Sequence, residues 1–285
     1  MKSKIFITFS VVIFIILAFI YRFNSVDRTG LVLPNCTIEN IIDTEIDFYI
    51  TSDIFLHNSH NDIKNRIYNY IYKANTILKN SCIPIKRKLG KLELIDTSSI
   101  EQEELETIKF QPIQLARVAK EILKILNKDD LISYYNNKPT RYFVIVYGEK
   151  FRVNGSTVIG NVNPNISNSM VILDYAASNH HLEHELGHLA GALHKNSDRA
   201  IALRNFYLNF SDKDDILKPY SGGTTCSGNS TIMYNGGSSV YPNLVLDVYS
   251  SPNIKFNGKP CGDIIKANNQ RVMLEYAKIL RSKLQ

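Results

Sequence analysis

Hydrophobic and polar positions follow two different periods along the first two thirds of the chain. Apolar residues at positions 63, 67, 70, 71, 74 and 77–78 repeat at helical spacing and predict a helix over 62–80. A second helical pattern covers 101–127; Pro112 breaks it, and its clearer part runs from 115 to 126. Strand character marks five other segments: residues 47–51, 83–95, 142–147, 156–162 and 170–173. This order of strands and helices predicts an α+β domain.

The remainder of the chain shows less regularity. Residues 142–147 are continuously apolar, which is typical of a strand buried at the centre of a sheet. After about residue 191 no clear period is visible until a final helix, predicted over 267–284. We therefore expect a sheet-based part up to about residue 191, followed by a mostly irregular part, residues 192–285, that ends in a helix.

One segment beyond the last strand contains the candidate chemistry. It runs from His184 to His194 and reads H-E-x-x-H-x-x-G-x-x-H. On a helix, His184 and His188 lie one turn apart on the same face and can bind one metal ion. Glu185 lies about 100° around the helix from His184, beside a metal-bound water rather than on the metal. Gly191 can take the left-handed conformation that ends a helix, so the chain can turn and bring His194 back as third ligand.

This ligand set predicts a single catalytic Zn²⁺ ion. Three protein ligands leave the fourth position of a tetrahedral zinc open, as a catalytic site requires. Five of the seven histidines lie between positions 180 and 194, which an ordinary polar helix face does not explain. His180 and His184 also have helical spacing, but Glu185 is correctly placed only if His184 is the first ligand. We therefore interpret His180 and His181 as rim or surface residues.

The motif resembles that of the metzincin clan of zinc metallopeptidases, in particular its bacterial reprolysin-like members. Residues 231–233, Thr-Ile-Met, look like the methionine turn that this clan places beneath the metal. Met233 would pack under the imidazoles without competing for zinc. The resemblance implies a two-lobed α+β fold: a mixed twisted sheet with two helices and the zinc helix above, and a mostly irregular lobe with a C-terminal helix below.

A closing segment adds to the resemblance, which then covers about residues 45–285. Residues 250–260 match the pattern S-x-P-x-[IV]-x-[FY]-x-G-x-P, and N-N-Q-R-V follows at 268–272, where the bacterial relatives have D-N-x-R-V. Asn268 therefore replaces an acidic residue, and no salt bridge is carried over to it.

Two other positions depart from the clan. Some metzincins have a tyrosine two residues after the turn methionine that helps to hold the transition-state oxygen. Here Tyr234 is one residue after Met233 and Asn235 takes the second place, so that role is not carried over. Lys195 follows the third histidine where many relatives have an acidic or other family-marking residue.

The N-terminus has the features of an export segment. Residues 5–21 form an apolar run broken only by Thr8 and Ser10, preceded by Lys2 and Lys4 and ended by Arg22. The run is long for a signal-peptide core, and no small-x-small cleavage site follows it. We favour an uncleaved signal anchor over residues 1–22 that leaves the rest of the chain outside the cytoplasmic membrane; a cleaved signal and a secreted protein is the alternative.

The cysteines fit an exported protein. There are four, and an even number in an exported chain indicates disulfides. From their positions we expect Cys226 to pair with Cys261, and Cys36 with Cys82. The alternative for Cys36 is a latency switch, in which its thiolate occupies the open zinc position.

Domain organisation and partners follow from length and charge. We expect a short linker over 23–44 and one catalytic domain over 45–285, with its upper lobe ending near residue 191. The net charge is +6, but the lysines are spread along the chain without a basic tract, so nucleic-acid binding is not expected. The expected partners are a protein or peptide substrate and, through the N-terminal segment, the membrane. The sequence does not indicate an oligomeric state.

The expected function is zinc-dependent endopeptidase activity with Glu185 as general base. The resemblance further implies that an edge strand within 156–163 pairs with an extended substrate, and that the chain from Met233 to about Tyr249 forms the wall of the pocket for the side chain after the cut. Two alternatives stay open: an exported zinc-binding adhesin or recognition protein of the same fold without turnover, and a zinc amidase acting on cell-wall peptides.

Overall fold

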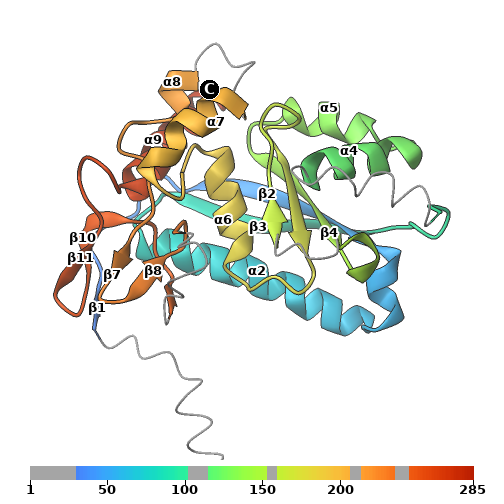
Figure 1. Cartoon of the computed structure of the whole chain (residues 1–285), viewed down its shortest axis with the longest axis horizontal. Helices are drawn as coiled ribbons and strands as arrows, with labels where there is room; N and C mark the ends of the chain where they lie inside the picture. The colour runs from blue at the N-terminus through green and yellow to red at the C-terminus, as the bar shows by residue number, and fades with distance from the viewer. Residues whose placement is uncertain (1–29, 102–114, 153–158, 206–212, 235–243) are drawn as a thin grey trace, which may run out of the picture.

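A five-stranded sheet forms the centre of the upper lobe (Figure 1). The computed structural model describes residues 30–101, 115–152, 159–205, 213–234 and 244–285. The sheet order is β3-β2-β4-β6-β5. The first four strands in this order are parallel, and β5 pairs antiparallel with β6 at the edge. The bounds are β2 Ile42–Thr51, β3 Ile85–Ile95, β4 Arg141–Tyr147, β5 Gly160–Asn161 and β6 Met170–Asp174.

Helices cover both faces of this sheet (Figure 1). Helices α2 (His60–Asn80) and α6 (His181–Leu189) pack on one face, and α4 (Leu115–Ile125) and α5 (Asp130–Asn136) pack on the other. Alternate residues of β4 enter the two cores, which explains why this strand is apolar throughout. Short 3₁₀ turns follow β2 at Ser52–Leu56 and β4 at Glu149–Phe151.

Helix α2 shows how local sequence sets an element boundary. It begins two residues before the predicted start, after Ser59. The Ser59 hydroxyl accepts a hydrogen bond from the Asp62 amide at 3.2 Å, and the Asp62 carboxylate accepts one from the Ser59 amide at 3.2 Å. This reciprocal capping box satisfies two of the amides that the first turn of a helix leaves unpaired.

The lower lobe contains short strands and short helices. One three-stranded sheet has the order β7-β8-β9, and another has the order β1-β10-β11. Their bounds are β1 Leu31–Val32, β7 Thr225–Cys226, β8 Asn229–Thr231, β9 Val245–Leu246, β10 Ser251–Phe256 and β11 Lys259–Cys261. The helical segments are η3 Asn196–Asp198, α7 Arg199–Asn205, α8 Lys213–Ile216 and α9 Asn269–Ser282. The two-lobed α+β architecture is the one predicted, and β1 adds an N-terminal strand where the sequence suggested a linker.

Two disulfides tie distant segments together. Cys36 is bonded to Cys82 and Cys226 to Cys261, which are the pairs expected from their positions. Because Cys36 is in a disulfide, it offers no thiolate to a metal, which argues against the latency-switch alternative. Two disulfides are typical of an extracellular protein.

The expected signal anchor, residues 1–22, lies outside the described residues. Among the helices that the structure describes, none is long and apolar enough to cross a membrane. The parts of the predicted helix and strand that fall on 102–114 and 153–158 also lie outside the described residues.

Candidate metal centre

Helix α6 and the turn after it bring three histidine side chains together. The Nε2 atoms of His184 and His188 are 3.2 Å apart, and that of His194 is 3.0 Å from the first and 2.9 Å from the second. In the described part of the chain these three residues form the one group of histidine, cysteine or acidic side chains able to hold a metal ion. The predicted ligand set is therefore assembled in space.

Hydrogen bonds at the opposite nitrogens fix the tautomers of two of these rings. His184 Nδ1 lies 2.6 Å from the Ile232 carbonyl oxygen, and His188 Nδ1 lies 2.8 Å from that of Ala192. A carbonyl can only accept, so both Nδ1 atoms donate and both Nε2 atoms present lone pairs to the centre. Two facing lone pairs repel each other unless a cation lies between them.

The electrostatics of the centre also favour neutral imidazoles. Burial lowers the pKa of His188 to about 3, with a further contribution from His194. Burial and the two neighbouring rings lower the pKa of His184 well below its usual value, and burial lowers that of His194. A neutral imidazole is the form that binds metal, so the three rings are ready to act as ligands at neutral pH.

The donor set fits zinc. At a Zn–N distance of about 2.0–2.1 Å in tetrahedral geometry, the nitrogens would lie about 3.3 Å apart, close to the separations found here. Three imidazoles leave one position open, and the Nδ1 hydrogen bonds to carbonyls are the kind of outer contact that orients zinc-binding histidines.

The turn that returns His194 to the centre depends on Gly191. The Gly191 amide donates to the His188 carbonyl at 3.0 Å and the Ala192 amide to the Gly187 carbonyl at 2.9 Å, which is a Schellman end to α6. Gly191 has φ +89°, and a Cβ there would lie 2.4 Å from the Ile216 carbonyl oxygen. No other residue type fits this position without strain, as the sequence motif suggested.

Buried polar side chains of the lower lobe hold the segment beside His194. The Asn269 amide nitrogen donates to the Leu193 carbonyl at 2.9 Å, and the Ser221 hydroxyl accepts from the Leu193 amide at 3.0 Å. The Gly223 amide donates to the His194 carbonyl at 2.8 Å. Sequence reasoning did not assign these roles; the position of Asn269 in the closing motif was the available signal. Asn268 instead caps α9 by accepting from the Arg271 amide at 3.2 Å.

The predicted methionine turn lies against α6. Met233 is fully buried in the cluster that also contains Ala190, Ile232 and Tyr249. A Cβ on Gly187 would lie only 2.9 Å from the Met233 sulfur, so the helix passes the turn at a glycine. The neighbouring Ile232 supplies the carbonyl that orients His184, which links the turn directly to the candidate metal ligands.

Glu185 lies beside the edge strand of the sheet. A Cβ on Gly160 of β5 would lie 2.6 Å from the Glu185 carboxylate, so the glycine leaves space for it. Glu185 is 5% exposed, and burial raises its pKa to about 8. A cation on the adjacent histidines would favour the charged form and oppose this shift.

Other predicted positions lie at the margin. The His180 and His181 rings stack with centroids 4.2 Å apart, and the His181 centroid is 6.1 Å from that of His184; neither residue belongs to the metal-binding group. The Lys195 ammonium lies 5.8 Å from the centre of the Tyr234 ring. Residues 235–243, which include Asn235 and most of the expected pocket wall, lie outside the described residues.

Comparison with known proteins gives a likeness of fold only. No family model matches the chain, and no curated protein matches it. A chain from a solved chaperone–substrate complex is similar, with TM-score 0.52 and 16% identity, over 84% of this chain and 34% of that one. Metalloproteinase-II from Bacteroides fragilis matches with TM-score 0.36 and 15% identity, over 89% of this chain and 59% of that one. This chain thus spans about a third of the first solved chain and somewhat over half of the second.

Proposed function

We propose that this protein is a zinc-dependent endopeptidase in which His184, His188 and His194 hold one zinc ion and Glu185 is the general base. One observation carries the proposal: the Nε2 atoms of three half-buried imidazoles converge within 3.2 Å of one another, and the neighbouring residue Glu185 has a buried carboxylate that borders a sheet edge. A protein that only binds zinc has no need of Glu185 at that place, so the arrangement favours hydrolysis over recognition without turnover.

Each group in the proposed site would have a separate role in the reaction. When bound, zinc would polarise the scissile carbonyl and lower the pKa of a water molecule. Glu185 would accept a proton on its carboxylate as the water attacks and pass it to the leaving amine nitrogen. The Ile232 and Ala192 carbonyls keep two imidazoles in the tautomer that binds metal.

The substrate would bind along β5. This strand is at the edge of the sheet, so its outer backbone groups can pair with an extended peptide. The close approach of Gly160 to Glu185 supports a base that would lie beside such a peptide. A substrate that binds in extended form along β5 would have its backbone next to the base. This arrangement supports hydrolysis of peptide bonds in the interior of the substrate chain. The two disulfides support an exported protein; membrane anchoring through residues 1–22 remains part of this proposal.

Metal content is the first test. We expect the full chain to bind about one zinc ion, measured by elemental analysis after dialysis. His188→Ala removes one ligand and should abolish this zinc at micromolar metal. His57→Ala is a matched control, since His57 lies outside the metal-binding group. Zinc content that His188→Ala leaves unchanged would show that the metal site is wrong.

Cleavage of a mixed peptide library, read by mass spectrometry, tests the reaction. Glu185→Gln keeps the size of the side chain and removes its basicity, so cleavage should fall by about 10²-fold or more while zinc stays bound. Near-normal turnover in this variant would mean that another group is the base. A wild type that holds zinc and cleaves no peptide would favour the recognition-protein alternative, and cleavage restricted to cell-wall peptides would favour the amidase.

A further inference from the structure

We propose that Tyr249 is a positioning residue for the metal centre. Its hydroxyl joins the lower lobe to Glu183 by a hydrogen bond and so sets the distance between the Ile232 carbonyl and His184. This inference rests on the proposed metal binding. It assigns a function to a buried polar network that lies beside the ligands and that neither the histidine motif nor the methionine turn predicts.

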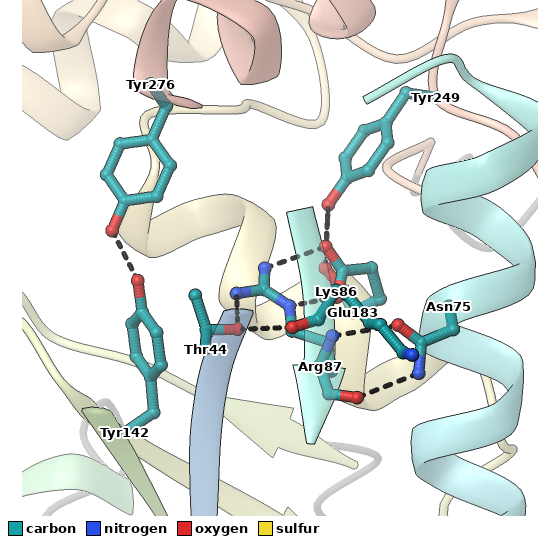
Figure 2. A network of polar contacts seen from close by, with 8 residues as sticks. All are labelled: Thr44, Asn75, Lys86, Arg87, Tyr142, Glu183, Tyr249 and Tyr276. Carbon is teal, nitrogen blue, oxygen red and sulfur yellow. Dashed lines mark hydrogen bonds and ion pairs between the residues drawn. The ribbon is translucent and has the colours of Figure 1, made fainter. Parts of the chain in front are cut away.

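The network joins both lobes to the start of α6 (Figure 2). The Arg87 guanidinium of β3 makes two contacts of 3.0 Å with the Glu183 carboxylate, and donates to the Thr44 hydroxyl at 3.2 Å. From the other side, the Tyr249 hydroxyl lies 3.0 Å from both the Glu183 carboxylate and the Glu183 main-chain oxygen. Glu183 therefore connects the sheet, the helix and the lower lobe, one residue before the first metal ligand.

Burial makes this connection rigid. Side-chain exposure is 1% for Arg87 and 0% for Glu183. The Arg87 main chain is itself fixed, because Asn75 of α2 donates to its carbonyl at 2.9 Å and accepts from its amide at 2.8 Å. Burial and the adjacent Glu183 charge raise the pKa of Tyr249 well above its usual value, so its hydroxyl keeps the proton that it donates.

Tyr249 and the carbonyl that orients His184 belong to one unit. The Ile232 amide donates to the Val248 carbonyl at 3.1 Å, so the turn and the segment before β10 are directly bonded. This unit contacts α6 at two successive residues, through Tyr249 to Glu183 and through Ile232 to His184 at 2.6 Å. Loss of the first contact leaves the hydrogen bond between Ile232 and His184 to hold the turn against α6.

Close packing gives the tyrosine a defined place. A Cβ on Gly187 would lie 2.9 Å from the Tyr249 hydroxyl oxygen, so the ring reaches α6 where the helix has no side chain. A buried ion pair is weak evidence for stability, because apolar residues of similar volume often serve as well. Orientation of α6 relative to the turn is a role that apolar side chains, which lack directional bonds, do not fill.

The test compares two tyrosine-to-phenylalanine variants in the full chain. Tyr249→Phe removes the hydroxyl that contacts Glu183 and keeps the ring. The matched control is Tyr276→Phe, which removes the 2.6 Å contact between the Tyr142 and Tyr276 hydroxyls in the same region of the molecule and leaves the contact between Tyr249 and Glu183 in place (Figure 2). Zinc affinity is measured by competition with a chelator, and the cobalt-substituted proteins are compared by visible absorption.

We expect Tyr249→Phe to weaken zinc binding about tenfold, the lower end of the cost for residues that orient metal ligands, and to change the cobalt spectrum. Tyr276→Phe should leave the zinc affinity and the cobalt spectrum unchanged, even if it lowers the unfolding temperature as much as Tyr249→Phe does. Equal zinc affinity and equal spectra for Tyr249→Phe and wild type would overturn the inference, as would an equal loss in both variants. If the wild-type protein itself bound neither zinc nor cobalt, the proposed function would be wrong. That result differs from one in which wild type and Tyr249→Phe bind zinc equally well, which would contradict only the role of Tyr249.

Discussion

The upper and lower lobes supply the three histidines of the candidate metal centre from very different kinds of structure. In the upper lobe, β2 and β3 are ten and eleven residues long, and apolar cores fill both faces of the sheet. In the lower lobe the strands have two to six residues, and a disulfide and buried polar side chains hold the chain. His184 and His188 thus rest on a packed helix, whereas His194 and the Ile232 carbonyl rest on cross-linked turns. The comparison predicts that the lobes respond to different perturbations.

The largest effect is expected in the upper lobe. Phe48 lies in the centre of β2 and is fully buried, so Phe48→Ala should lower the free energy of unfolding by about 3–5 kcal/mol. Chemical denaturation followed by circular dichroism measures this loss. Leu56→Ala, at a position that is 76% exposed, is the control and should change it by no more than about 0.5 kcal/mol. A cost for Phe48→Ala below that of the control would show that packing does not dominate this lobe.

A smaller and more local effect is expected from the lower-lobe disulfide. Replacing Cys226 and Cys261 together by alanine opens a cross-link with a sequence separation of 35 and should cost about 2–4 kcal/mol. Hydrogen exchange should rise in β7, β8 and β11 while the amides of β2 and β4 stay protected, and zinc affinity should fall because the turn loosens.

The second disulfide provides the matched comparison. Cys36→Ala combined with Cys82→Ala removes a bridge with a separation of 46, which joins the segment before β2 to the end of α2 and not to β7, β8 or β11. It should free the segment before β2 and leave zinc affinity unchanged. Equal losses of zinc in both double variants would mean that disulfides affect the centre only through overall stability.

The smallest effect concerns the exposed start of α2. Ser59→Ala should destabilise the upper lobe by about 0.5–2 kcal/mol and leave zinc affinity unchanged. Hydrogen bonds from the Ser59 hydroxyl and amide lower the pKa of Asp62, so this contribution is present above the pKa of the unfolded chain and is lost as pH falls through the lower, folded value. Between pH 6 and pH 2, the unfolding temperature of Ser59→Ala should therefore fall less steeply with pH than that of wild type. An equally steep fall in both proteins would contradict the role of the capping box.

The regular parts of the fold and the ligand set could be predicted because their signals are local. The helical period from 63 to 78 and the apolar run of β4 require only neighbouring residues, as does the histidine spacing. Nothing local marks the shift in register between β2 and β3 near Ile46 and Phe48. Arg87 appears in the sequence as one cation among Lys86 and Lys88, and only the fold buries it against Glu183. The residues beside the candidate metal centre that were missed are those whose partners are distant in sequence.

The difference between local and distant contacts also predicts the order in which the parts of the candidate metal centre form. All three proposed ligands lie within eleven consecutive residues, so a short stretch of nascent chain can close around a metal at little entropic cost. The groups that orient them come from far away: Ile232 is 48 positions from His184, Tyr249 is 66 from Glu183, and Asn269 is 76 from Leu193. Such distant contacts form late in folding. An immature chain should therefore exchange a bound metal ion quickly, and retention of such an ion would become a measure of maturation.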